Sequence, residues 1–150
     1  MLDSLTIIIA IILIIGTTVF ILFRLLLKRV SATKSKLKQE LTEETIEGAI
    51  HNANCFGIES LGVGQVRGNG SWALTEKRIL FLFWMGSRRI DIPLATIQNI
   101  SMGKAFLGKA VGRELLIIHY TTNQGEQDKC AWLMSNPLQI KEHIERKIES

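Results

Sequence analysis

The sequence has few of the residues that mark several protein classes. Its 150 residues include two cysteines, two prolines and one tyrosine. Two cysteines are too few for a disulfide-rich scaffold, and the scarcity of proline, with only twelve glycines, excludes collagen-like and low-complexity chains. An apolar fraction of 47% excludes an intrinsically disordered chain. The composition predicts a membrane protein with a folded domain.

Charged residues are absent from Leu5 to Phe23. Nineteen residues at about 1.5 Å each span roughly 28 Å, close to the thickness of a bilayer's hydrocarbon core. Because Arg24 can extend its side chain to the interface, we predict a transmembrane helix over residues 5–27, after a short extracytoplasmic N-terminus, residues 1–4. A cleaved signal peptide would have a basic start and a shorter apolar core. A buried helix of a soluble protein is the weaker alternative, because one small domain could hardly bury a helix that is apolar on all sides.

Basic residues dominate the downstream flank of this segment, whereas the upstream flank carries only Asp3. The membrane-proximal basic residues are Arg24, Lys28, Arg29, Lys34, Lys36 and Lys38. By the positive-inside rule, the N-terminus lies outside and the C-terminal domain in the cytoplasm. Cytosolic thiols are reduced, so we predict that Cys55 and Cys130 are free and buried. The basic run has two interpretations that can hold together, a solvated topology signal and a contact with anionic lipid.

The rest of the chain alternates short apolar runs with turn residues. Residues 28–54 are predicted to form a basic juxtamembrane linker, which includes residues 31–36, and an amphipathic helix that begins near residue 36 or 42. Strands are predicted over residues 56–66 (interrupted by glycine), 72–75, 79–85, 89–92, 97–102, 114–121 and 126–133.

Three further local signals complete the expected fold. A tight turn is predicted at residues 68–70, and a glycine-rich loop over residues 103–113. Asn136, Pro137 and isoleucines at every fourth position predict a C-terminal amphipathic helix. The predicted class is α+β, with an N-terminal transmembrane helix and then a bent antiparallel sheet or split barrel of about seven strands, capped by that helix.

Two segments carry a resemblance to GRAM and bacterial pleckstrin-homology-like domains. The first matches the pattern of a glycine, a gap and L-T-x-x-R before an apolar run, at Gly70, Leu74, Thr75 and Arg78. The second matches I-P-L-x-x-I-x-x-I, at Ile92, Pro93, Leu94, Ile97 and Ile100. The resemblance covers about residues 55–148, and we place the domain at residues 55–150. It implies a pleckstrin-homology-like fold whose relatives often bind phosphoinositides through basic loops at the open end of the barrel.

The residues of the first segment also have plain structural interpretations. The Thr75 hydroxyl, at a turn, can satisfy backbone groups. Arg78 is interpreted as an ion-pairing residue in preference to a ligand contact. The loop at residues 103–113 is richer in glycine than the family pattern. These roles maintain a fold and do not define a ligand.

The histidines do not form a catalytic or metal-binding pattern. His51 lies four residues before Cys55 without a further ligand nearby, His119 lies on a strand, and His143 lies among charged residues. Residues 62–64 lack the rest of a dinucleotide-binding motif. We predict a protein that is not an enzyme and needs no cofactor or metal. The basic residues beside a membrane span, without a nucleic-acid-binding motif, also argue against nucleic acid as a partner.

Two groups of residues are candidate contacts for a lipid or a protein partner. The first contains basic residues near predicted turns: Arg67, Lys77, Arg78, Arg88 and Arg89. In the second, two apolar residues lie between two lysines: Lys104, Phe106, Leu107 and Lys109. That loop either enters the lipid interface, docks a protein partner, or folds back onto the core.

We therefore predict a single-pass, membrane-anchored, non-enzymatic cytoplasmic module. Its partner is anionic membrane lipid, with a phosphoinositide as one candidate. The alternative is a protein-interaction or scaffolding module that recruits partners to the membrane.

Overall fold

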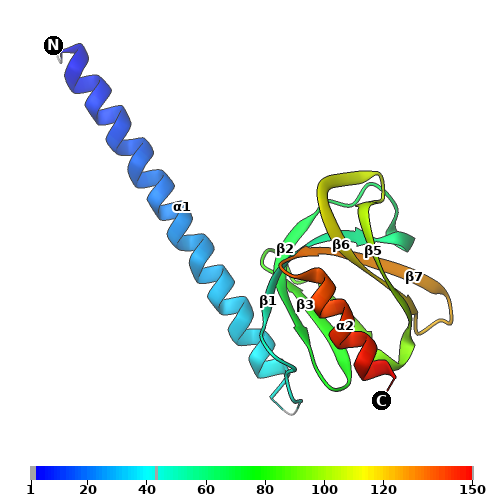
Figure 1. The fold of residues 1–150 in the computed structure, drawn as a ribbon. Coiled ribbons are helices and arrows are strands. Elements are labelled where there is room, and N and C mark those ends of the chain that lie inside the picture. Colours follow the sequence, from blue (N-terminus) through cyan, green and yellow to red (C-terminus); the bar gives the residue numbers. More distant parts are fainter. Residues whose placement is uncertain (1–2, 43, 150) are drawn as a thin grey trace.

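The computed structural model describes residues 3–42 and 44–149 (Figure 1). Its helices and strands are α1 (Ser4–Glu40), β1 (His51–Ile58), β2 (Gly68–Leu74), β3 (Arg78–Phe83), β4 (Arg89–Pro93), β5 (Ile97–Phe106), β6 (Lys109–Thr121), β7 (Gln127–Met134) and α2 (Pro137–Ile148), with 3-10 turns η1 (Glu59–Leu61) and η2 (Leu94–Thr96). The seven strands form one antiparallel sheet in the order β4-β3-β2-β1-β7-β6-β5. The predicted α+β class is confirmed.

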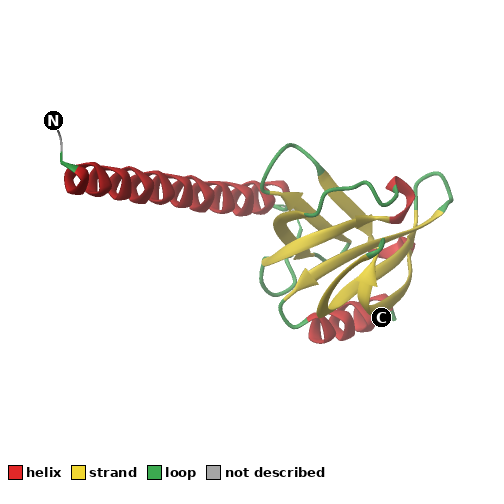
Figure 2. Cartoon of the chain, turned by 90° about the horizontal axis from the view of Figure 1, so that it is seen from above, coloured by secondary structure: helices red, strands yellow, loops and turns green. Residues whose placement is uncertain are grey.

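The N-terminal helix α1 projects away from the sheet domain (Figure 2). Its 37 residues correspond to about 55 Å at 1.5 Å per residue, and it is long and apolar enough to cross a bilayer. It begins at Asp3, whose carboxylate accepts a hydrogen bond from the Thr6 amide at 2.8 Å. In its apolar part, the Thr18 hydroxyl donates to the Ile14 carbonyl at 2.8 Å, which satisfies a polar group without water.

The helix continues through residues 31–36, which were expected to be a linker. It does so because its last turns pack on the sheet. Leu37 and Leu41 are buried against Ala73 of β2 and Leu80 of β3. The predicted amphipathic helix ending near residue 54 is wrong for a related reason. The chain leaves α1 at Leu41 and enters β1, which pairs with both β2 and β7 and so satisfies its backbone on both sides.

Three other local predictions are corrected by sheet pairing. Residues 68–70, expected to form a turn, begin β2, where Gly70 pairs with Phe83. The expected loop over residues 103–113 is mostly hairpin, because β5 and β6 pair as far as Phe106 and Lys109. Residues 61–66, expected to extend the first strand, lie instead in a loop that starts with η1.

The main core lies between the concave face of the sheet and α2. It contains Trp72, Phe81 and Trp132, with Ile140 and Ile144 of α2 packed against them. Asn136 stands at the start of α2 as expected, but its backbone is left-handed and its side chain makes no capping bond. The two cysteines are free and buried, as predicted.

Candidate functional site

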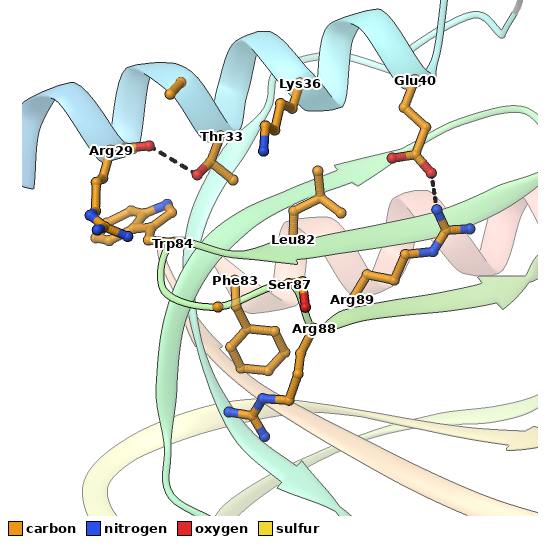
Figure 3. A pocket seen from close by; sticks show the side chains of 12 residues that line it. Arg29, Thr33, Lys36, Glu40, Leu82, Phe83, Trp84, Ser87, Arg88 and Arg89 are labelled. Carbon is orange, nitrogen blue, oxygen red and sulfur yellow. Dashed lines mark hydrogen bonds and ion pairs between the residues drawn. The ribbon is translucent and has the colours of Figure 1, made fainter.

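A cleft of about 330 Å³ lies between the second half of α1 and the hairpin made by β3 and β4 (Figure 3). We call it the basic cleft. From α1 it is lined by Arg29, Ala32, Thr33, Lys36 and Glu40, and from the hairpin by Leu82, Phe83, Trp84, Gly86, Ser87, Arg88 and Arg89. The cleft exists because Leu37 and Leu41 hold α1 against the outer face of β2 and β3.

Four basic residues and one acidic residue line the basic cleft. The Arg88 guanidinium points away from α1, toward the Phe83 ring, so the basic groups on the α1 side are those of Arg29, Lys36 and Arg89 (Figure 3). Arg89 is already engaged, since its guanidinium contacts Glu40 of α1 and lies 3.0 Å from a carboxylate oxygen of Asp91. In the part of the chain that the structure describes, no ion pair is formed by Arg29, Lys36 or Arg88. The cleft therefore carries an excess of positive charge that the protein does not neutralise.

The loop that closes the cleft is fixed by its own contacts. The Trp84 amide donates to the Asn69 carbonyl at 2.9 Å, and its indole N–H donates to the Ser71 hydroxyl at 3.1 Å. The Arg88 guanidinium lies over the Phe83 ring, 4.5 Å from its centroid, a favourable cation–π arrangement. These contacts position the loop without using an acidic partner for Arg88.

Arg78 has the structural role that the sequence suggested. Its guanidinium lies 2.7 Å from a carboxylate oxygen of Glu44 and 2.7 Å from one of Asp91. The Thr75 hydroxyl accepts hydrogen bonds from the amides of Lys77 and Arg78 and lies 2.8 Å from Glu44. This network joins the segment after α1 to the turn between β2 and β3, and it shares Asp91 with Arg89 of the basic cleft.

The other predicted basic contacts are dispersed. Arg67 lies over the Phe56 ring, 4.7 Å from its centroid, and Lys77 is exposed beside Glu76. Lys104 is exposed on β5, and Lys109 donates to the Gln65 carbonyl. Of these predicted contacts, Arg88 and Arg89 line the cleft, and only Arg89 points toward α1 (Figure 3). Arg67, Lys77, Lys104 and Lys109 do not line it.

Phe106 and Leu107 fold back onto the protein. Phe106 is buried with Phe56 and Leu115 on the outer face of the sheet, and Leu107 packs against the same cluster. Of the three interpretations of their loop, the structure shows the one in which these two residues belong to the core.

The membrane-proximal basic residues divide between faces of α1. Arg29 and Lys36 line the basic cleft. Arg24 lies over the Phe20 ring of the same helix at 5.4 Å. Lys28, Lys34 and Lys38 do not line the cleft. Sequence reasoning did not select Trp84 or Ser87, although a tryptophan at the end of an apolar run was a usable signal for an interfacial residue.

His51 and His119 are half-buried within the fold. Burial, together with the nearby charge of Lys34, lowers the pKa of His51. His119 forms a hydrogen bond with the Ser101 hydroxyl at 2.8 Å, and burial lowers its pKa. Within the described residues, no cluster of three or more His, Cys, Asp or Glu side chains is placed to hold a metal ion.

The fold and the cleft define a small α+β domain joined to a long apolar helix. No protein-family model matches the sequence, and no curated protein matches it significantly. Among solved structures, it is similar to the C-terminal domain of an unknown protein from Leishmania infantum. That match has 14% identity and a TM-score of 0.55, and it covers 81% of this chain and 99% of that chain. At this identity the likeness shows the fold alone, so the GRAM and pleckstrin-homology-like resemblance remains a prediction.

Proposed function

We propose that the protein is a single-pass membrane protein whose cytoplasmic domain binds the headgroups of anionic lipids in the basic cleft. The observation that carries the proposal is that Arg29 and Lys36 of α1 both line the basic cleft, without an ion pair for either among the described residues (Figure 3). The orientation is supported by the basic flank that follows the apolar segment.

The position of the cleft along α1 supports this function. If the span ends at Leu27, Arg29 lies about 3 Å beyond the hydrocarbon core, and Lys36 about 14 Å beyond it, at 1.5 Å per residue. The headgroup layer of one leaflet is about 5–7 Å thick. One end of the cleft is therefore at headgroup level and the other extends toward the cytosol, which suits a headgroup that projects from the membrane.

The lining chemistry suits a phosphate group. Guanidinium groups donate paired hydrogen bonds to phosphate oxygens, and an ammonium adds a compact charge. Arg29 supplies a guanidinium, Lys36 an ammonium and Ser87 a hydroxyl. At about 1 kcal/mol for each basic residue near an anionic surface, these two cations favour an anionic over a neutral headgroup by roughly thirtyfold.

Lipid competition tests the proposal on the full chain. The protein, purified in a neutral detergent, would be offered equal amounts of phosphatidylcholine and phosphatidylglycerol, and the bound lipids counted by native mass spectrometry. We expect preferential retention of phosphatidylglycerol and loss of that preference in the double variant Arg29→Glu, Lys36→Glu.

The control variant is Lys77→Glu, Arg146→Glu, which makes the same change in net charge at exposed positions outside the cleft. It should retain the preference. Equal retention of the two lipids by the unaltered protein would reject the proposal and favour the protein-interaction alternative.

A further inference from the structure

Apolar side chains are exposed in two loops of the sheet domain. Outside α1, six large hydrophobic side chains of the described residues are exposed, and four of them lie in residues 59–67 and 84–88. Their exposed fractions are 63% for Leu61, 70% for Val63, 80% for Val66 and 74% for Met85. The other two, Leu138 and Ile148, are single residues of α2 and are less exposed, at 55% and 41%.

The two loops are neighbours, although 18 residues or more separate Leu61 and Val66 from Met85. A cavity of about 160 Å³ lies between them, lined by Leu61 and Val66 on one side and by Phe83 and Arg88 on the other. Val63 lies in the same loop as Leu61 and Val66, and Met85 in the same loop as Arg88. We call the four exposed apolar side chains of these two adjoining loops the loop patch. Patches of this kind mark contacts with a protein or a membrane.

The first loop is built to display these side chains. Gln65 turns inward, where its side chain accepts a hydrogen bond from the Ile58 amide at 3.0 Å and donates to the Gly62 carbonyl at 2.7 Å. The Gln65 carbonyl in turn accepts a bond from Lys109 of β6. With Gln65 held in this way, Val63 and Val66 on either side of it remain exposed.

The loop patch has a basic rim. Arg67 and Arg88 lie over the rings of Phe56 and Phe83, and Lys109 lies against the first loop. Residues 59–67 and 84–88 include one acidic residue, Glu59, whose carboxylate lies 3.0 Å from the Lys129 ammonium. Apolar side chains surrounded by cations match the interfacial layer of an anionic membrane. The same positive rim would repel a second copy of this chain.

The loop patch lies on the membrane-facing side of the domain. The loop with Met85 closes the basic cleft, which also contains Arg29 of α1. The β5–β6 hairpin, whose Lys109 contacts the first loop, lies toward the N-terminal side of α1, whereas α2 and the C-terminus lie on the opposite side (Figure 1). A span of 23 residues is about 34 Å long against a core of about 30 Å, which is accommodated by tilting. A tilt toward the domain moves the loop patch into the interface.

We propose that the loop patch is a second membrane contact, in which Leu61, Val63, Val66 and Met85 insert into the interfacial layer of the bilayer that holds α1. This inference rests on the proposed membrane anchoring, but not on headgroup selection by the basic cleft. The domain then lies against the membrane at two places, the base of α1 and the loop patch, instead of swinging freely.

Fluorescence of a site-specific label tests the inference on the full chain in proteoliposomes of pure phosphatidylcholine. Val63→Cys would carry an environment-sensitive nitrobenzoxadiazole label, and Leu138→Cys, on α2, would be the matched control. Both positions are exposed, so neither change disturbs packing, whereas Cys55 and Cys130 are buried and label slowly. We expect a blue-shifted emission at position 63, quenched by lipids with a doxyl group near the glycerol, and a water-like, unquenched emission at position 138.

Each other outcome overturns the inference. Water-like emission at both positions would show that the patch does not insert. A blue shift at position 63 without quenching by doxyl lipid would identify a protein contact, such as a second copy. Because the vesicles are neutral, this inference and the proposed function can fail separately. Insertion of position 63 without a preference for phosphatidylglycerol in the lipid competition would reject the proposed function alone. That preference without insertion would reject this inference alone.

Discussion

Arg78 of β3 and Glu44 of the segment behind α1 lie 2.7 Å apart as an ion pair that is mostly shielded from solvent. The exposed fractions of the two side chains are 22% and 14%. Because α1 is followed immediately by this segment, the pair contributes to holding the membrane helix and the sheet in one arrangement. The predictions below test that arrangement and the function built on it.

Replacing Arg78 should destabilise the domain. Arg78→Met leaves Glu44 without its ion partner, whereas Asp91 keeps Arg89, and an uncompensated charge in a largely buried site costs about 3 kcal/mol. Chemical denaturation of the purified protein, followed by tryptophan fluorescence, measures the free energy of unfolding. Lys77→Met is the control, because its ion pair with Glu76 is exposed and worth less than about 1 kcal/mol. Equal stability of the two variants would contradict the account.

The stability of the domain should fall at acidic pH, in part through Glu44. Burial opposes ionisation of this carboxyl, but hydrogen bonds from Thr75 and Arg78 outweigh it and hold its pKa below the ordinary value of 4.5. A lowered pKa in the folded state stabilises the protein above the ordinary value, and this contribution is lost as pH falls through the folded-state pKa. Glu44→Gln should lower stability at neutral pH and flatten the dependence below about pH 4.5, whereas the exposed Glu76→Gln should do neither.

Detaching α1 from the sheet should weaken both stability and lipid preference. Leu37 is fully buried against β2 and β3, and truncating a buried leucine costs about 3–5 kcal/mol. Leu37→Ala should therefore unfold at lower denaturant concentration. It should also retain less phosphatidylglycerol, because the basic cleft forms only while α1 is docked. Gln39→Ala, exposed in the same turn, should change neither measurement.

Gly70 should not tolerate a side chain. A Cβ there would lie 2.4 Å from the Leu82 carbonyl oxygen, which is backbone of the paired strand β3 and has little room to move. Gly70→Ala should cost about 1–3 kcal/mol through overpacking. Gly64→Ala is the matched control, since a Cβ there meets no atom within 4 Å. If the two variants unfold at the same denaturant concentration, the close pairing of β2 and β3 described above is wrong.

Strong local patterns predicted the fold class, and tertiary pairing decided the details that were missed. Both helices were predicted, because each has a pattern that fits only a helix. These patterns are the uncharged run before Arg24 and the regularly spaced isoleucines of α2. Leu37, Leu41, Ile46 and Ile50 suggested one helical stripe, but they pack on one sheet face from a helix and from an extended segment. No local pattern distinguishes these cases.

The candidate site was predicted only in part, because it joins distant segments. Arg29 and Lys36 were selected for their place beside the span, and Arg88 and Arg89 for their place at a turn. The convergence of Arg29, Lys36 and Arg89 follows from the docking of Leu37 on β2 and β3, which a single sequence does not reveal. Phe106 was an ambiguous candidate because its burial depends on how the β5–β6 hairpin lies on β1 and β7.

Hydrogen exchange of the full chain in nanodiscs tests headgroup binding most directly. The account predicts slower exchange of the backbone amides of residues 84–89 in discs that contain phosphatidylglycerol than in discs of phosphatidylcholine alone. In the Arg29→Glu, Lys36→Glu variant the difference should disappear. The same exchange rates in both kinds of disc for the unaltered protein would contradict the claim that the basic cleft binds anionic headgroups.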